Sequence, residues 1–286
     1  MKLGNSAFSL AYLCVSIAVL AFGFVAPGRT PRTSDPAPRA VSPLATTWPD
    51  YAVPGPAVPP PSGPDAETIR YGYQLMAQTF AVIGPEVADK AMRFAGNNLA
   101  CQNCHLDGGT NRVGLSLVGV FSTFPKYSSR DHRTISLVER INECMTRSMN
   151  GRALPETSRE MSAFVAYIRY LGNGPVAAPP TLPAPPLPAD TTRGAEVYLR
   201  VCAACHQPDG SGHRAAPAAD ARGYVQPPLW GPDSYNDGAG MDRPERTAPF
   251  VRFNMPRGVD PQHPQLTVQE AWDVAAYVDS QPRPGK

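Results

Sequence analysis

Two segments of the chain carry apolar residues at the spacing of an amphipathic helix. They are SAFVAYIRYLG at 162–172 and EAWDVAAYVDSQ at 270–281, in which apolar residues recur three and four positions apart. Phe164-Val-Ala-Tyr-Ile aligns with Val274-Ala-Ala-Tyr-Val, so the two helices look related. The remaining turns are rich in Gly and Pro, and the sequence contains no convincing alternating strand. The pattern predicts an all-α fold built twice.

The N-terminus has a different pattern. A single positive residue, Lys2, precedes an apolar to weakly polar run of 20 residues from Ala7 to Ala26. Such a run at the start of a chain is typical of a secretory signal or of an uncleaved signal anchor over residues 1–26. We therefore expect export to the periplasm, and the run leaves tethering to the inner membrane open.

Proline marks the domain boundaries. The chain has 34 prolines in 286 residues, and they concentrate at 27–64 and 173–190. Segments of this composition cannot bury a core, so we interpret the first as an extended tether and the second as a linker. Two domains are expected between and after them, at 65–172 and 191–286. The net charge of +2 argues against a large nucleic-acid surface.

Four of the six cysteines lie in two copies of one motif. CQNCH contributes Cys101, Cys104 and His105, and CAACH contributes Cys202, Cys205 and His206. Cys-x-x-Cys-His is the attachment signature of haem c, in which the thiols bond the porphyrin and the histidine ligates the iron. One copy per domain predicts two covalently bound haem c groups. A zinc site would require further ligands in each domain, and a thioredoxin-like site would not explain the histidine.

Each haem iron also needs a sixth ligand or an open position. In the second domain FVRFNMPRG places Met255 before a proline in a loop, which suits an axial thioether. Met241 is the nearest rival, and packing is the commoner fate of methionine.

The first domain lacks a Met-Pro loop, and its candidate ligands fall within one predicted helix, 133–151, ended by Asn150-Gly151. They are Met145, Met149 and Cys144. The two methionines belong to an apolar stripe that is most simply core packing.

The remaining candidate, Cys144, shares a predicted helix face with Arg140 and Ser148, each four residues away. Neighbouring arginines would favour its thiolate, the form that binds metal. A small buried hydrophobe is the alternative for Cys144. Arg130 and Arg133 lie upstream and Arg147 nearby, so either an oxyanion pocket or a solvated face is consistent with the sequence.

Several segments together resemble the dihaem thiosulfate dehydrogenases, which are related to the dihaem cytochrome subunit of the Sox complex. The segments, which span residues 65–286, are GNNLACQNCHLDGG, RINECMTRSMNG, CAACHQPDGSG, PPLWGPDSYNDGAGM and FNMPRG. The resemblance implies two cytochrome c-like domains joined by the Pro-rich linker.

The resemblance also implies ligands and a reaction. The first haem would have His105 and Cys144 as axial ligands, and the second would have His206 and Met255. Two thiosulfates would couple to tetrathionate at the first haem, with Cys144 as the reactive centre. Electrons would leave through the second haem to a soluble cytochrome or similar acceptor.

Three further residues match family positions that hold the sulfur oxyanion, namely Arg130, Arg140 and Ser148. Some relatives carry a lysine before the second haem's methionine, where this chain has Asn254. We therefore expect methionine ligation only.

Two other functions compete with this one. A non-catalytic dihaem electron carrier would use methionine at both haems and leave Cys144 to packing. A Sox-complex cytochrome subunit is expected to use cysteine at the second haem, and this chain has no cysteine after Cys205. The sequence leaves the direction open, since the same site could reduce tetrathionate.

Overall fold

Helices form both halves of the described chain, which comprises residues 61–172, 180–214 and 223–286 of the computed structural model. The predicted signal or anchor segment at 1–26 and most of the predicted tether lie outside these residues. None of the helices described is long and apolar enough to cross a membrane. All described residues belong to one compact unit, Pro38–Lys286.

The first half contains four α-helices and a two-stranded sheet among its described residues. Its elements are α1 (Ala66–Ala77), α2 (Thr79–Val82), β1 (Lys126–Ser128), β2 (Arg133–Ile135), α3 (Leu137–Thr146) and α4 (Arg159–Tyr170). Four short 3-10 turns lie between α2 and β1: η1 (Lys90–Met92), η2 (Cys101–Asn103), η3 (Asp107–Gly109) and η4 (Val120–Thr123).

The second half repeats the helical plan with fewer turns. Its elements are α5 (Thr191–Val197), the π-helical turn η5 (Tyr198–Cys202), α6 (Ala203–His206), β3 (His213–Arg214), β4 (Tyr224–Gln226), α7 (Pro244–Asn254) and α8 (Val268–Asp279).

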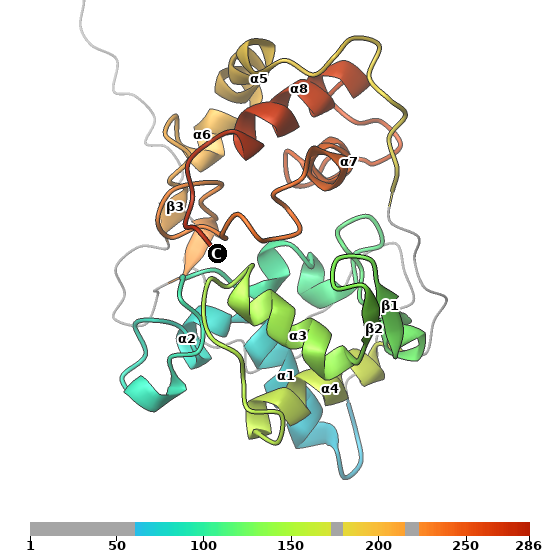
Figure 1. The fold of residues 1–286 in the computed structure, drawn as a ribbon, viewed down its shortest axis with the longest axis vertical. Coiled ribbons are helices and arrows are strands. Elements are labelled where there is room, and N and C mark those ends of the chain that lie inside the picture. Colours follow the sequence, from blue (N-terminus) through green and yellow to red (C-terminus); the bar gives the residue numbers. More distant parts are fainter. Residues whose placement is uncertain (1–60, 173–179, 215–222) are drawn as a thin grey trace, which may run out of the picture. The chain divides into compact units, whose positions relative to one another are not determined.

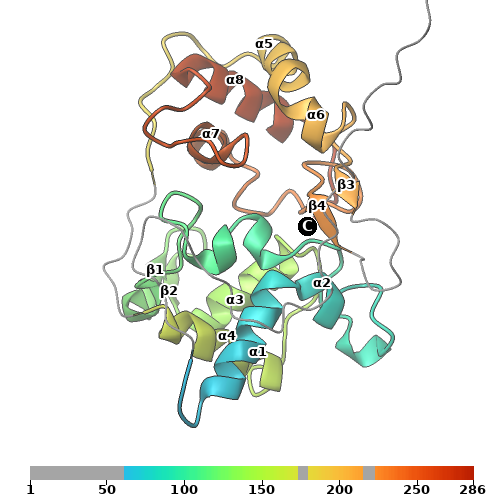
Figure 2. The same ribbon diagram turned by 180° about the vertical axis from the view of Figure 1, so that it is seen from behind.

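The same crossing of the first and last helix organises both halves (Figure 1, Figure 2). Helix α1 packs on α4, and α5 packs on α8. A glycine makes each close approach possible. A Cβ atom on Gly72 would lie 2.1 Å from the carbonyl oxygen of Ala163, and one on Gly194 would lie 2.1 Å from that of Asp273. The predicted pair of related helices, 162–172 and 270–281, thus corresponds to α4 and α8 in equivalent positions.

The structure corrects two details predicted from the sequence. Short antiparallel strands are present: β1 pairs with β2 and β3 pairs with β4. The helix predicted over 133–151 is shorter, because residues 133–135 form β2 and α3 begins only after Ser136. Ser136 and Glu139 cap this helix reciprocally, and that capping box fixes its start.

Helix α3 ends at Thr146, and residues 147–149 form a turn. Ser148 therefore does not share a helical face with Arg140 and Cys144, as its spacing had predicted. The apolar stripe is confirmed as core, since Ile135, Met145 and Met149 are all buried.

Polar contacts join the two halves. Asn97 Nδ2 donates to the carbonyl of Ser234 at 3.1 Å, and the Asn98 amide donates to Asp233 Oδ1 at 3.0 Å. Asn236 Nδ2 donates to the carbonyl of Thr146 at 2.9 Å, which caps the end of α3 from the second half. These bonds position the segment before α7 beside the segment that carries Cys144.

Replacing either crossing glycine should destabilise the protein. Gly72→Ala and Gly194→Ala are each expected to lower the free energy of unfolding by about 1–3 kcal/mol, because overpacking forces the backbones apart. Denaturant unfolding of the haem-loaded protein measures the change. Gly285→Ala is the control, since its Cβ would lie 4.0 Å from Asp237. Equal stability of all three variants would contradict the close approach.

Candidate active site

The second Cys-x-x-Cys-His motif lies on consecutive helical turns. Turn η5 ends at Cys202, and α6 carries the motif on to His206. His206 is buried and its Nδ1 donates to the carbonyl of Pro227 at 2.8 Å. Burial lowers the pKa of His206, which keeps the ring neutral. A neutral ring that donates from Nδ1 presents Nε2 as a ligand, the arrangement common to metal-binding histidines.

The first motif repeats this arrangement on the 3-10 turn η2. His105 Nδ1 donates to the carbonyl of Leu115 at 2.6 Å, which again leaves Nε2 for a metal. Thr79 Oγ1 donates to Cys101 Sγ at 3.3 Å. Burial raises the pKa of the free Cys101 and Cys104 thiols to about 12.

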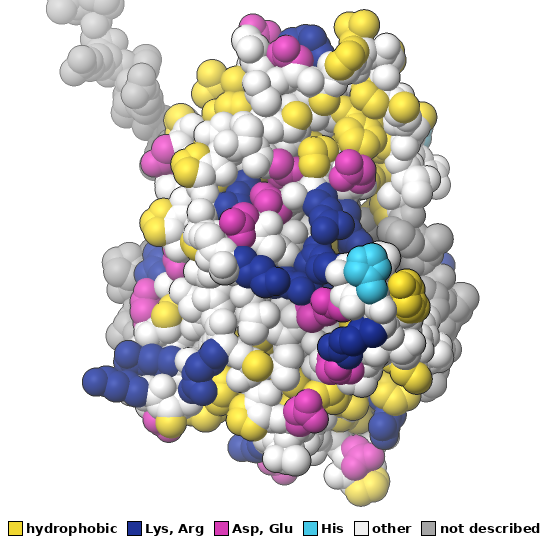
Figure 3. Space-filling view, viewed as in Figure 1, with side chains coloured by type: hydrophobic (Ala, Val, Ile, Leu, Met, Phe, Trp, Pro, Cys, Tyr) yellow, Lys and Arg dark blue, Asp and Glu magenta, His cyan; other side chains and the backbone are white. Residues whose placement is uncertain are grey.

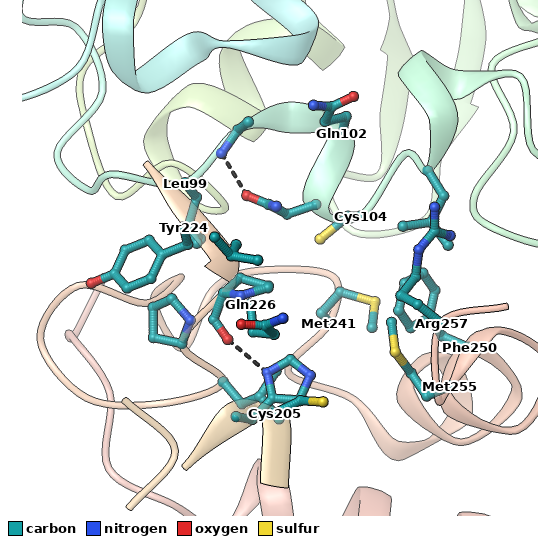
Figure 4. A pocket seen from close by; sticks show the side chains of 18 of the residues that line it. Leu99, Gln102, Cys104, Cys205, Tyr224, Gln226, Met241, Phe250, Met255 and Arg257 are labelled. Carbon is teal, nitrogen blue, oxygen red and sulfur yellow. Dashed lines mark hydrogen bonds between the residues drawn. The ribbon is translucent and has the colours of Figure 1, made fainter. Parts of the chain in front are cut away.

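A cavity of about 730 Å³ lies between the two motifs. Cys104 lines it from the first half, and Cys202, Cys205 and His206 line it from the second. Figure 4 shows Cys104 and Cys205 facing this space from their separate segments, together with Met241 and Met255. Leu99, Phe250, Val274 and other apolar side chains make up much of its wall, as a porphyrin requires.

The cysteine outside the motifs, Cys144, lies on α3 against the first motif. Arg140 Nη1 donates to its Sγ at 3.1 Å, one helical turn away. Burial alone would raise the pKa of Cys144, but the positive charge of Arg140 and a hydrogen bond with His105 outweigh it and lower the pKa to about 7. The thiolate is thus more accessible at Cys144 than at Cys101 or Cys104.

These residues fit two haem c groups. Around the first motif, His105 helps to lower the pKa of Cys144, and the charge of Cys144 in turn raises the pKa of Cys101 and Cys104, so a candidate ligand pair lies near both attachment points. Around the second, His206 and two methionines line one cavity.

The candidate methionines separate into two groups. Met145 and Met149 are packed in the core of the first half. Met241 and Met255 both line the cavity. Met255 follows the last residue of α7, and the preceding Asn254 is buried. Asn254 Nδ2 donates to the carbonyl of Val113 in the first half at 3.0 Å, which fixes the Met255 loop there.

The predicted oxyanion residues have different environments. Arg140 contacts Cys144 directly, whereas Arg130 Nη1 donates to the carbonyl of Gly238 in the second half at 2.8 Å. Ser148 follows α3, and its carbonyl accepts from Asn97 at 3.0 Å. Arg133 is turned toward solvent and pairs with Glu139.

Sequence reasoning missed two arginines of the second half, Arg243 and Arg246, whose charges act on this group. Burial, Arg147 and Arg243, in that order, lower the pKa of Arg130. Burial and the charge of Arg140 lower the pKa of Arg246. The segment of Arg243 and Arg246, DRPERT, carries two acidic residues as well, so it does not stand out as basic, and no spacing rule connects it with α3, about 100 residues earlier.

Comparison with known proteins assigns the chain to a family. The family described as SoxA/TsdA, cytochrome c domain, matches residues 91–176, and the cytochrome c family matches residues 191–282. Thiosulfate dehydrogenase of Allochromatium vinosum is 41% identical over 236 residues, which cover 78% of this chain and 81% of that protein. This chain belongs to the thiosulfate dehydrogenase family.

Other members of the family agree. Thiosulfate dehydrogenase of Stutzerimonas stutzeri is 35% identical over 232 residues, which cover 79% of this chain and 72% of that protein. Among solved structures, thiosulfate dehydrogenase (TsdBA) from Marichromatium purpuratum, in its "as isolated" form, superposes with a TM-score of 0.68 at 34% identity. The match covers 78% of this chain and 48% of that one, so the chain spans about half the length of that protein.

Family membership confirms the predicted all-α fold with two cytochrome c domains. It also confirms two covalently bound haem c groups and an oxidoreductase that transfers electrons.

Loss of one attachment motif should remove one haem. Cys202→Ser combined with Cys205→Ser is expected to leave a single covalent haem, because no thiol remains to bond the second porphyrin. Mass spectrometry of the denatured protein counts the haems. Cys144→Ser is the control and should retain two, since this thiol is not an attachment point; loss of a haem there would contradict the assignment.

Proposed function

We propose that the protein oxidises thiosulfate by coupling two thiosulfate dianions to tetrathionate at Cys144. The observation that carries this proposal is the 3.1 Å contact between Arg140 and the Cys144 sulfur, beside His105 of the first haem motif. A cysteine that served only packing would not need a guanidinium directed at its sulfur. The thiosulfate dehydrogenases similar to this chain support the same substrate.

The proposal includes the iron ligands of both haems. His105 and Cys144 would ligate the first haem, and His206 and Met255 the second. Each histidine is oriented through Nδ1 by a backbone carbonyl, Leu115 in one half and Pro227 in the other. A thiolate lowers and a thioether raises the reduction potential of a haem, so electrons would run downhill from the first haem to the second.

The two haems, when bound, would supply the two one-electron acceptors that the coupling of two thiosulfates requires. Cys144 would act as the nucleophile that holds one substrate sulfur during the reaction. Arg140 stabilises the thiolate before substrate bonds and again when it is released. Arg130, Arg140 and Ser148 would bind the sulfonate oxygens, since charge-assisted hydrogen bonds from arginine suit oxyanions.

A plain electron carrier explains less of the site. It would ligate both haems with methionine, but Met145 and Met149 of the first half are packed in the core. A Sox-complex cytochrome subunit would be expected to place a cysteine at the second haem, and no cysteine follows Cys205. The coupling can run in either direction, and the potentials of the haems and of the acceptor decide which prevails.

The cellular setting is part of the proposal. Residues 1–26 would direct export to the periplasm, with the tether at 27–64 carrying the two haem domains, 65–172 and 191–286, which the linker at 173–190 joins. The second haem would pass electrons to a soluble cytochrome or similar acceptor.

Replacing the nucleophile tests the function directly. Cys144→Ala is expected to abolish thiosulfate oxidation with an artificial electron acceptor, because no sulfur remains to hold the substrate, and both haems should stay attached. Thr146→Ala, on the same helix, is the control and should keep normal turnover. Full activity of Cys144→Ala would refute the catalytic role, and an unchanged thiolate–haem spectrum in that variant would refute the ligation.

The division of labour between the domains has its own test. Met255→Gly should change the reduction potential of the second haem and slow electron exit, while the KM for thiosulfate stays constant. Redox titration followed by absorbance measures the potential. Met241→Leu is the matched comparison, because Met241 lines the same cavity. If Met241→Leu changed the potential and Met255→Gly did not, Met241 would be the ligand of the second haem. Loss of thiosulfate binding in Met255→Gly would contradict the assignment of substrate binding to the first domain.

A further inference from the structure

A group of arginines from both halves surrounds the Cys144 end of α3. The group, called here the arginine cluster, consists of Arg130, Arg140, Arg147, Arg243 and Arg246. Figure 3 shows Lys and Arg side chains gathered across this face, over the region between α3 and α7. Three of these residues come from the first domain, and two come from the start of α7 in the second.

The cluster carries more positive charge than the described carboxylates around it neutralise. Arg147 pairs with Asp131 and Glu143 at 3.6 Å, and Arg140 pairs with Glu143 at 3.4 Å. Within residues 61–172, 180–214 and 223–286, the other three arginines make no ion pair; they are Arg130, Arg243 and Arg246. Such an excess suits a multivalent anion.

Contacts between the halves hold the segment before Arg243 and Arg246 against the end of α3. The Asn236 amide donates to the carbonyl of Arg147 at 3.2 Å, and Arg130 donates to the carbonyl of Gly238 at 2.8 Å. The segment that leads into α7 is therefore docked on the segment that leads out of α3. Arg243 and Arg246 follow this docked segment and remain exposed, so that an anion can reach them.

Burial first, and then the charges of neighbouring arginines, lower the pKa of two members of the cluster, Arg130 and Arg246. Partial burial and the neighbouring Arg140 and Arg243 lower the pKa of Arg246. Partial burial and the neighbours Arg147, Arg243 and Arg140 lower that of Arg130 as well. An anion bound among them would relieve the repulsion between these charges.

We propose that Arg243 and Arg246 bind the second thiosulfate, the one that is never bonded to Cys144, and so complete a substrate pocket shared by the two haem domains. This inference rests on the proposed function. Arg140, which contacts the Cys144 sulfur, serves the first thiosulfate.

The chemistry requires two distinct oxyanion positions. In the first step the Cys144 thiolate and the terminal sulfur of one thiosulfate would form an S–S bond, a two-electron oxidation for which the two haems, when bound, would supply the acceptors. In the second step the terminal sulfur of another thiosulfate attacks the bound sulfur, tetrathionate leaves, and the thiolate is restored. The second step brings a thiosulfate dianion to an adduct that already carries a sulfonate. The positive charge that stabilises this second dianion must therefore lie farther from Cys144 than the positive charge of Arg140.

The decisive variants are Arg243→Gln and Arg246→Gln in the haem-loaded protein. Arg159→Gln is the control, because this exposed arginine of α4 lies outside the cluster, where it pairs with Glu67 at 3.8 Å and stacks on the ring of Tyr71. Each cluster variant should raise the KM for thiosulfate about tenfold, as expected for loss of a charge-assisted contact, and Arg159→Gln should not.

Quenched-flow mass spectrometry separates the two steps. After mixing with thiosulfate, the adduct on Cys144 should form at the normal rate in Arg246→Gln but decay about tenfold more slowly. Slower formation with normal decay would place these arginines at the first thiosulfate and overturn the assignment.

Calorimetry provides a readout independent of turnover. Thiosulfate is titrated into holoprotein carrying Cys144→Ala, with and without Arg243→Gln and Arg246→Gln. We expect the added pair to weaken one of two binding events about tenfold. Binding and kinetics identical to those of Arg159→Gln would refute the inference. If the unaltered protein failed to oxidise thiosulfate, the proposed function would fall, while the calorimetry would still decide whether these arginines bind the anion.

Discussion

The hydrogen bond from Arg140 to the Cys144 sulfur is the contact on which the proposed chemistry depends. It joins residues one helical turn apart, so it exists only because α3 is helical there. The capping box of Ser136 and Glu139 starts that helix, and Met145 fixes its rotation by packing in the core. In the proposed mechanism, the same guanidinium that would favour the thiolate for binding iron would also make that sulfur a better leaving group once substrate had bonded to it. One contact can thus serve both ligation and turnover.

The histidine of the haem motif is oriented in the same way in both halves. The side chains proposed as the second ligand of each iron differ between the halves. His105 and His206 each donate from Nδ1 to a backbone carbonyl in a loop that follows the motif. The distal residues differ in their chemistry, with a thiol beside an arginine in the first half and thioethers in an apolar cavity in the second. A repeated cytochrome domain thereby has two unequal environments for its haems, and under the proposed ligation this inequality would give the electrons a direction.

The sequence predicted what depends on short-range pattern and missed what depends on tertiary contact. The Cys-x-x-Cys-His motifs predicted haem attachment, and the helical period predicted α4, α8 and the buried stripe of α3, because each signal lies within a few turns of chain. The shared helical face predicted for Ser148 was wrong, because the stop signal at Asn150-Gly151 does not show that α3 already ends at Thr146. Arg133–Ile135 was expected to be helical, yet it forms a strand that pairs with Lys126–Ser128. The pairing with this second strand, and not the local propensity of the residues, determines the structure here. Nothing local could place Arg246 near Arg140.

The contacts between the halves would link the proposed substrate site to the proposed route of electron exit. Asn236 docks the segment before α7 on the end of α3, and Asn254, at the other end of α7, donates to the carbonyl of Val113. Val113 lies two residues before Leu115, whose carbonyl orients His105. Helix α7 is therefore fixed at both ends to the first domain, near Cys144 at its start and near the His105 loop at its end. Because Met255 directly follows this helix, a shift of α7 toward bound substrate would also move the loop that carries the second haem's candidate ligand.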